Sequence, residues 1–281
     1  MSDAREWIGR SETRDDVASA APVRGLRATL DRDPVEIQAG MELAPLWHWL
    51  YFLPTERQSD IGPDGHARRG GFLPPIALPR RMWAGSQFEF HAPVRVGDAL
   101  RRTSTIVDLS HKQGRTGPLA FVKLRHEIRC NGASDPAIVE FHDIVYRQAR
   151  QPGDVEPQPE AAPAATWRRA IVPDDVLLFR YSALTFNGHR IHYDRKYVTE
   201  VEGYPGLVVH GPLIATLLLD LLHRHLPEAE VAAFSFRARR PTFDLHPFAV
   251  CGAPQADSRT VRLWAEDHEG WLTMDAVATL R

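Results

Sequence analysis

Residues 211–226 read Gly-Pro-Leu-Ile-Ala-Thr-Leu-Leu-Leu-Asp-Leu-Leu-His-Arg-His-Leu. The run is nearly all apolar and predicts a long helix. Pro212 lies at the first position of this helix, where a missing backbone N–H costs little. A helix that is apolar on almost every face must be buried on most sides, so we expect a sheet to wrap around it.

Predicted strands follow this helix to the end of the chain. Residues 260–266 and 271–280 form a predicted hairpin, and Glu269-Gly270 between them is a turn signal. One buried helix followed by a meandering antiparallel sheet is an α+β arrangement, which is called a hotdog.

The first half of the chain repeats this order of elements. Residues 41–53 are apolar and are predicted to form a helix, with Pro45 in its first turn. Residues 121–130 and 137–146 are predicted strands that are joined at Asn131-Gly132, a strong hairpin signal. The repeat predicts a second hotdog, in which a second antiparallel sheet wraps a central helix.

A shared spacing supports an internal duplication. The stretches 88–98 and 236–246 both begin with Phe, have Pro five positions later and then reach a turn, so we expect each to open a run of strands. Residues 150–166 carry four prolines and no apolar periodicity, which predicts a semi-extended linker. The sequence therefore predicts two domains, over residues 1–149 and 167–281.

Composition narrows the class of protein. Hydrophobic residues make up 43% of the chain, and the net charge of −2 gives no sign of a nucleic-acid or membrane partner. The two cysteines, Cys130 and Cys251, lie too far apart in sequence for a zinc motif or a disulfide framework. No signal peptide and no apolar run long enough for a membrane span is recognisable. We expect a cytoplasmic, soluble protein.

Chemistry-bearing residues are concentrated just before the long helix. Residues 181–194 read Tyr-Ser-Ala-Leu-Thr-Phe-Asn-Gly-His-Arg-Ile-His-Tyr-Asp, and His210-Gly211 follows sixteen residues later. His192 can take or give a proton near neutral pH. The backbone N–H of Gly211, at the start of the helix, can stabilise negative charge that develops on an oxygen. A base and an oxyanion site are the two parts that chemistry beside a carbonyl group requires.

Neighbouring residues allow more than one interpretation. Asn187 can hold a water molecule through its amide, or it can serve only as a turn residue before Gly188. Arg190 can pair with a substrate carboxylate, bind a phosphate or face solvent. The remaining candidates for contacts with substrate or for support of the loop are Tyr181, Ser182, His189 and His210, the last of which we expect to be a packed, hydrogen-bonded histidine.

The stretch 182–194, followed by His210-Gly211-Pro-Leu, resembles the hydratase-2 motif of the MaoC-like enoyl-thioester hydratases. The segments 45–54, 71–85, 112–117 and 143–147 are similar to the degenerate first hotdog of a two-hotdog subgroup. That subgroup includes mesaconyl-C4-CoA hydratases, itaconyl-CoA hydratases and the type 2 hydroxyacyl-thioester dehydratases of mitochondrial fatty-acid synthesis. The resemblance extends from about Trp7 to the C-terminus.

The resemblance implies a hydro-lyase whose catalytic hotdog is the second one. His192 would transfer protons, Asn187 would position water and Gly211 would bind the thioester oxygen. In the wider family the position of Asn187 is an Asp, so the acidic member of the usual Asp/His pair is an amide here. This departure argues against a mechanism that needs a carboxylate base at position 187.

The resemblance also implies an acyl-CoA substrate. We expect mesaconyl-C4-CoA or itaconyl-CoA, hydrated to citramalyl-CoA, with Arg190 facing the free carboxylate. The alternatives are a fatty 3-hydroxyacyl or enoyl thioester, acyl-thioester binding without catalysis, and thioester hydrolysis; residues 181–192 lack the carboxylate that hydrolysis would want. We expect no metal and no cofactor other than the coenzyme A of the substrate, and the sequence leaves a homodimer open.

Overall fold

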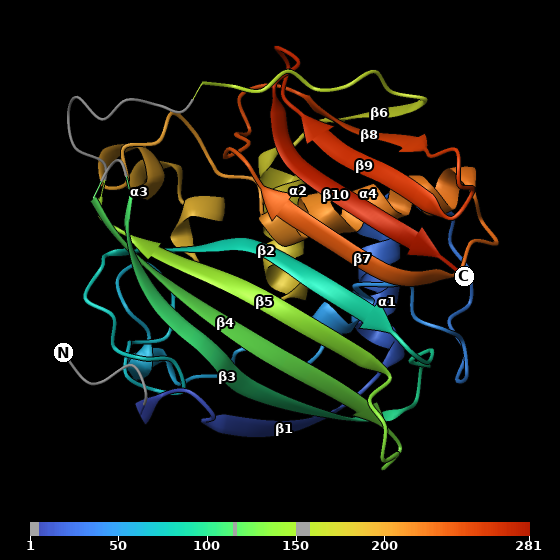
Figure 1. The fold of residues 1–281 in the computed structure, drawn as a ribbon, viewed down its shortest axis with the longest axis horizontal. Coiled ribbons are helices and arrows are strands. Elements are labelled where there is room, and N and C mark those ends of the chain that lie inside the picture. Colours follow the sequence, from blue (N-terminus) through green and yellow to red (C-terminus); the bar gives the residue numbers. More distant parts are fainter. Residues whose placement is uncertain (1–5, 115–116, 150–157) are drawn as a thin grey trace.

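A computed structural model describes residues 6–114, 117–149 and 158–281. Ten antiparallel strands form a single sheet in the order β1-β3-β4-β5-β2-β7-β10-β9-β8-β6 (Figure 1). The strands are β1 Ser11–Val17, β2 Arg80–Phe90, β3 Ala99–Gly114, β4 Gly117–Cys130, β5 Ile138–Arg147, β6 Trp167–Ile171, β7 Val231–Ala238, β8 Phe248–Pro254, β9 Thr260–Glu266 and β10 Leu272–Leu280.

The sheet consists of two five-stranded parts that meet at β2 and β7. These strands pair antiparallel, with Gly85 opposite Arg237 and Phe88 opposite Phe234. One part comes from the first half of the chain and the other from the second half (Figure 1). The two sheets expected from the sequence are therefore present, but they join edge to edge into one continuous sheet.

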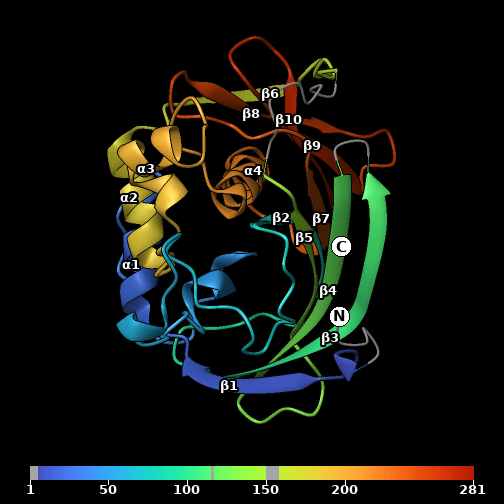
Figure 2. The ribbon, with the colours of Figure 1, turned by 90° about the vertical axis from the view of Figure 1, so that its left-hand side faces the viewer.

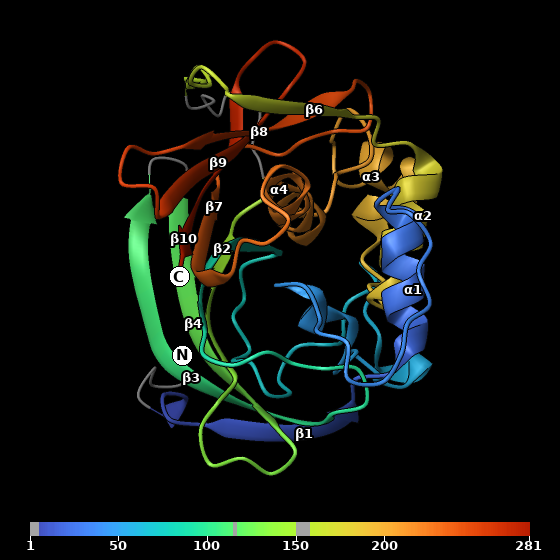
Figure 3. The same cartoon turned by 90° about the vertical axis from the view of Figure 1, so that its right-hand side faces the viewer.

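The predicted long helix is confirmed as α4, Gly211–His225. All ten residues from Leu213 to Leu222 are buried. Figures 2 and 3 show α4 inside the curve of the sheet. The remaining α-helices, α1 Ala20–Thr29, α2 Asp175–Leu184 and α3 Arg195–Glu200, lie beyond α4, on the side away from the strands. The apolar faces of α4 thus pack against protein on several sides, as the sequence predicted.

The helix predicted over residues 41–53 is wrong. This segment contains only a single 3₁₀ turn, η2 Trp47–Leu50. Leu46 before the turn and Phe52 after it have φ of 71° and 57°, values that a continuous helix cannot accommodate. Tertiary contacts explain the difference, because Trp47, His48 and Leu50 are all buried by this bent path. Within the residues that the structure describes, the degenerate first hotdog has no full central helix.

The strand boundaries correct one further expectation. β2 ends at Phe90 and β7 ends at Ala238, so the repeated Phe-to-Pro spacing marks the end of each strand and not its beginning. Both predicted hairpins are confirmed. Asn131 and Gly132 have φ of 53° and 75°, the left-handed conformation that the turn at the end of β4 needs.

Ion pairs centred on Asp220 of α4 connect the two halves of the chain. Asp220 is 6% exposed, and its carboxylate lies 2.6 Å from Arg32, 2.8 Å from Arg169 and 2.7 Å from Arg224. Arg32 belongs to the first half and the other three residues belong to the second. A buried carboxylate with three guanidinium partners fixes the relative position of these segments, since removing the partners would leave a buried charge.

Residues 150–157 of the predicted linker lie outside the described residues. Glu160 and Ala162 form backbone hydrogen bonds of 2.8 and 2.9 Å with Leu272 and Gly270, so this end of the predicted linker runs along the second half. The domain boundaries at 149 and 167 stay predictions. Among the described helices, none combines the length and apolarity that crossing a bilayer would take.

Candidate active site

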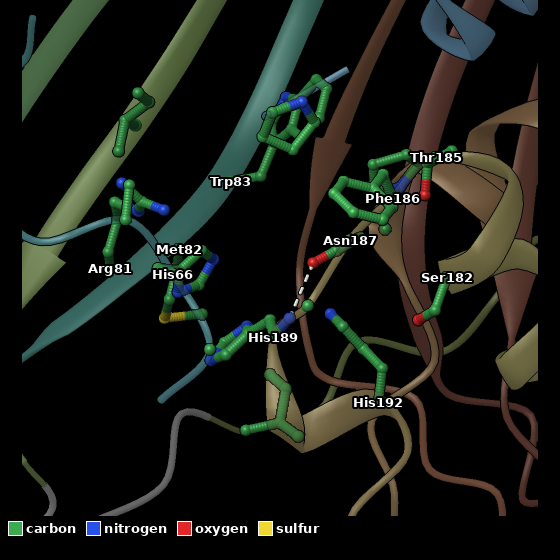
Figure 4. Close-up of a pocket in the computed structure, with 18 of the residues that line it drawn as sticks. His66, Arg81, Met82, Trp83, Ser182, Thr185, Phe186, Asn187, His189 and His192 are labelled. Atoms are coloured by element: carbon green, nitrogen blue, oxygen red, sulfur yellow. Dashed lines mark hydrogen bonds between the residues drawn. The ribbon is translucent and has the colours of Figure 1, made fainter. Parts of the chain in front are cut away.

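A cavity of about 1690 Å³ lies between the two halves of the chain. Figure 4 shows Ser182, Asn187 and His192 of the second half on one side of this pocket, and His66, Arg81, Met82 and Trp83 of the first half on the other. Gly211 at the start of α4 also lines it. The structure therefore brings together the three residues predicted to be catalytic, Asn187, His192 and Gly211.

His192 ends the 3₁₀ turn η4, Arg190–His192, and is 8% exposed. Its Nδ1 atom is 2.6 Å from the carbonyl oxygen of Val208. Because a carbonyl oxygen only accepts hydrogen bonds, Nδ1 carries the proton and Nε2 keeps a free lone pair. Burial lowers the pKa of His192 to about 4. The side chain is thus a neutral imidazole at pH 7, with one nitrogen able to accept a proton.

Asn187 follows α2, and its backbone N–H donates to the carbonyl oxygen of Ser182 at 2.8 Å. The side-chain Oδ1 accepts the backbone N–H of His189 at 3.0 Å, as the dashed line in Figure 4 shows. The amide NH₂ remains to donate to a ligand or to water. Asn187 is therefore both a loop-forming residue and a hydrogen-bond donor at the cavity, so the two interpretations from the sequence coexist.

Gly211 is the first residue of α4, and His210 before it has φ of −61° and ψ of 127°. No side chain caps this helix end. Within the described part of the chain, the Gly211 N–H donates no hydrogen bond. An unpaired N–H at a helix N-terminus is suited to an oxyanion, and the helix dipole strengthens the effect.

His210 lies behind His192 and does not line the cavity. It is 0% exposed, its Nε2 atom is 2.8 Å from Ser182 Oγ, and its ring stacks on that of His192 at 3.7 Å. Tyr181 packs edge-on against His210 at 5.1 Å. This position does not support a direct contact between His210 and substrate, one of the roles that the sequence left open. Tyr181, Ser182 and His210 instead support the His192 ring from behind, although Tyr181 and Ser182 also reach the cavity wall.

Arg190 has partners of its own. Its guanidinium is 2.7 Å from the Asp194 carboxylate, donates to the Pro63 carbonyl oxygen at 3.0 Å and lies 4.1 Å from the centre of the Tyr197 ring. A guanidinium engaged in this way is poorly placed to neutralise a substrate carboxylate. The expectation that Arg190 faces the acyl carboxylate therefore loses its structural support, because the i, i+4 neighbour Asp194 takes that place.

The turn 62–66 from the first half is a part of the site that sequence reasoning missed. The backbone N–H of Arg190 donates to the Asp64 carbonyl oxygen at 2.9 Å, which docks the turn onto the loop that follows Asn187. Gly65 has φ of +90°, and a Cβ atom there would overlap the carbonyl oxygen of Gly188. Only glycine fits at position 65. The signal was the sequence Gly-Pro-Asp-Gly-His, in which a turn places a histidine next to a carboxylate.

Asp64 and His66 form a hydrogen-bonded pair within this turn. Asp64 Oδ2 is 3.2 Å from His66 Nδ1, and the His66 ring lies 4.0 Å from that of His189. Burial lowers the pKa of His189 to about 2, and burial also lowers the pKa of His66, partly offset by Asp64. In the described ranges, one group of possible metal ligands has donor atoms that all lie within 4.8 Å of one another. It consists of Asp64, His66 and His189. The hydrogen bond between Asp64 and His66 favours a carboxylate–imidazole pair over a metal site.

The end of the cavity in the first half is polar. Glu140 is buried and accepts from Ser86 Oγ at 3.0 Å and from Trp49 Nε1 at 3.3 Å. The histidines and arginines that line this end are His48, Arg81, Arg102, His126 and His142.

Comparison with known proteins shows the family to which this chain belongs. Residues 46–244 match the family model described as hydroxyacyl-thioester dehydratase type 2. The chain is also 45% identical to the mesaconyl-C(4)-CoA hydratase of Chloroflexus aurantiacus, over 99% of this chain and 98% of that protein. The chain belongs to the type 2 hydroxyacyl-thioester dehydratase family.

Solved structures confirm the fold predicted for this family member. HtdX of Mycobacterium tuberculosis superposes with a TM-score of 0.68 at 18% identity, covering 96% of this chain and 99% of that one. A second protein of the same organism, described as having a double hotdog fold, superposes with a TM-score of 0.60 at 15% identity, covering 98% and 96%. As a type 2 dehydratase family member with a double hotdog fold, the protein is an enzyme of the hydro-lyase class.

Proposed function

We propose that this enzyme reversibly hydrates mesaconyl-C4-CoA to citramalyl-CoA. The observation that carries the proposal is the 45% identity to a mesaconyl-C(4)-CoA hydratase over nearly the whole of both chains. Coenzyme A enters as part of the substrate, and the proposal requires no other cofactor. Itaconyl-CoA is the second substrate of the same kind.

The geometry supports a role for each predicted catalytic residue. The thioester oxygen accepts the Gly211 N–H, so that the helix terminus stabilises the enolate. The free Nε2 lone pair of His192 exchanges the proton at the α-carbon, because its Nδ1 proton is held by Val208. The Asn187 amide donates to the oxygen of water, or to the hydroxyl group of the product, at the β-carbon.

A polar cavity end supports a dicarboxyl substrate. A free carboxylate that is buried with the acyl group has to be neutralised. Arg81 on β2 lines the cavity, and among the described residues no carboxylate lies within 4 Å of its guanidinium. We therefore assign the substrate carboxylate to Arg81 and not to Arg190, which is paired with Asp194.

The competing substrate is a fatty 3-hydroxyacyl thioester, which the name of the family suggests. A fatty chain would have to pass the charged and imidazole side chains at the end of the cavity, and this favours the dicarboxyl substrate. Thioester hydrolysis and acyl-thioester binding without turnover are separate outcomes of the test below.

The test is a substrate panel with the purified protein. Mesaconyl-C4-CoA, itaconyl-CoA, crotonyl-CoA and a medium-chain enoyl-CoA are offered, and loss of enoyl-thioester absorbance is recorded beside thiol release. We expect the highest kcat/KM for mesaconyl-C4-CoA without thiol release. A preference for the medium-chain thioester would replace the substrate assignment, thiol release would indicate hydrolysis, and binding without any turnover would contradict the enzymatic role.

A further inference from the structure

The amide at position 187 leaves one proton without an acceptor. Adding water to a double bond requires that the water loses a proton while its oxygen bonds to the β-carbon. An amide can orient this water but cannot take up its proton near pH 7. Residues 181–192 contain no carboxylate, and burial lowers the pKa of His189 to about 2, so a stronger acceptor for this proton has to come from elsewhere in the fold.

The turn 62–66 brings a carboxylate-backed histidine to the same cavity. Asp64 Oδ2 lies 3.2 Å from His66 Nδ1, so the carboxylate accepts the Nδ1 proton and Nε2 keeps its lone pair. A carboxylate behind an imidazole also stabilises the imidazolium that forms when the ring takes up a proton. His66 is half-buried and lines the cavity.

Contacts with residues 187–192, the catalytic loop, fix the position of this turn. Its backbone accepts the N–H of Arg190, and Gly65 packs directly against Gly188, the residue after Asn187. The His66 ring lies 4.0 Å from that of His189, and the His189 ring is 5.3 Å from that of His192. Figure 4 shows His66 across the pocket from Asn187 and His192. The first half of the chain thus supplies a base on the face opposite His192.

We propose that His66, oriented by Asp64, is a second catalytic proton-transfer residue, which exchanges the oxygen-bound proton at the β-carbon while His192 exchanges the proton at the α-carbon. This inference rests on the proposed hydratase function. It makes the degenerate hotdog part of the catalytic site, and it makes Asp64 a positioning residue that acts through His66.

The proton balance is simple in both directions. In dehydration, His192 Nε2 removes the α-proton, the electron pair of that bond forms the enolate held by Gly211, and the β-hydroxyl group leaves as water with the proton of the His66 imidazolium. In hydration, the water proton goes to His66 as the oxygen bonds to the β-carbon, and His192, which first takes up a proton from solvent, gives that proton to the α-carbon. Either direction moves one proton between His66 and His192, and exchange with solvent restores the starting state.

Because the two histidines exchange different protons, exchange of the α-proton and dehydration should be separable. Citramalyl-CoA carrying deuterium at the α-carbon is incubated with enzyme, and loss of deuterium is followed by mass spectrometry while enoyl formation is followed by absorbance. His66→Gln should reduce dehydration by about 10²–10⁴-fold, the usual size of a general acid–base contribution, and should retain deuterium exchange. His192→Gln should abolish both reactions, and His91→Gln, at an exposed position outside the cavity, serves as the matched control.

Asp64→Asn provides an independent variant if His66→Gln does not fold. It keeps the size of the side chain and removes the charge behind His66, so we expect lower kcat and a pH–rate profile for dehydration shifted to lower pH. The groups that face His66 and share this titration are Asp64, Arg69, Arg81 and His189.

Three results would overturn the inference. These are unchanged dehydration in His66→Gln, equal loss of dehydration and exchange in that folded variant, and an unshifted pH profile in Asp64→Asn. Failure of the proposed function is recognised separately, since wild-type enzyme would then show neither dehydration of citramalyl-CoA nor exchange of its α-proton.

Discussion

The Nδ1 atom of His192 lies 2.6 Å from the carbonyl oxygen of Val208, and the Val208 N–H donates to the carbonyl oxygen of Ile191 at 3.0 Å. Two segments that are separated by sixteen residues therefore hold each other next to the start of α4. The consequence is chemical as well as structural, because the Val208 carbonyl fixes the tautomer of His192 and leaves Nε2 as the acceptor. Because a main-chain oxygen performs this role, the Val208 side chain takes no part in it.

Replacing His192 tests its proposed role directly. His192→Ala should lower kcat for mesaconyl-C4-CoA by about 10²–10⁴-fold, because general acid–base catalysis is lost. Circular dichroism should show an intact fold, since His210 and Ser182 behind the ring remain bonded to each other. Turnover close to that of the wild type would mean that another residue exchanges the α-proton.

Two substitutions at position 187 separate its two hydrogen bonds. Asn187→Ala removes both the acceptor for the His189 N–H and the amide donor, so we expect a loss of kcat comparable to or smaller than that of His192→Ala. Asn187→Asp keeps the acceptor and installs the carboxylate of the wider family. We expect Asn187→Asp to be the more active of the two, measured as kcat over pH 5 to 9, and equal loss in both would show that the amide donor is what matters.

Local sequence patterns were enough to predict α4 and the two hairpins. The run of leucines in α4 and the turns at Asn131-Gly132 and Glu269-Gly270 predicted their elements because each pattern is decided within a few residues. His192 and Asn187 could be proposed for the same reason, since both lie in one short loop. The Arg190–Asp194 pair has an i, i+4 spacing, and this local pattern argues against a free guanidinium.

Long-range contacts decide what the sequence could not. The segment 41–53 is apolar throughout, so its period cannot distinguish a helix from the bent path that buries Trp47 and His48. Gly65 has its meaning only beside Gly188, more than a hundred residues away. No local pattern places His66 opposite His192, because their proximity depends on how the two halves of the chain pack together.

Arg81 and Arg190 make opposite predictions for the substrate carboxylate. Arg81→Met should raise KM for mesaconyl-C4-CoA strongly, by about 10–100-fold if a charge-assisted hydrogen bond worth ~1.5–3 kcal/mol is lost, and should change KM for crotonyl-CoA little. Arg190→Met is the matched control and should affect both substrates alike, through the loop that Asp194 and Pro63 hold. A selective effect of Arg190→Met on the dicarboxyl substrate would restore the original assignment.

Docking of the two halves at the site can be tested with a pair of glycines. Gly65→Ala meets the Gly188 carbonyl oxygen, so it should push the turn 62–66 away from the catalytic loop and lower kcat at least tenfold. Gly40→Ala, outside the cavity lining, has a similar φ of +86° with no atom within 4 Å of the added Cβ. It should carry only the backbone strain, about 1–3 kcal/mol of unfolding free energy, and leave kcat unchanged. Equal kcat in the two folded variants would show that the turn is not needed in its observed position.

Buried neutral histidines should make the fold sensitive to acid. Burial lowers the pKa to about 4 for His126 and His192 and to about 3 for His142, against about 6.5 for an unfolded histidine. Below pH 6.5 the unfolded chain therefore binds protons that the folded chain excludes, and the free energy of unfolding should fall as pH drops towards 4, by up to about 1.4 kcal/mol per pH unit for each histidine. Urea unfolding at pH 7.5, 6.5, 5.5 and 4.5 measures this slope. His142→Phe, which can keep the stacking on Trp83 (4.0 Å between ring centres), should reduce the slope, whereas His91→Gln on the surface should leave it unchanged. A free energy of unfolding that stays constant between pH 6.5 and 4.5 would show that these histidines take up protons in the folded state.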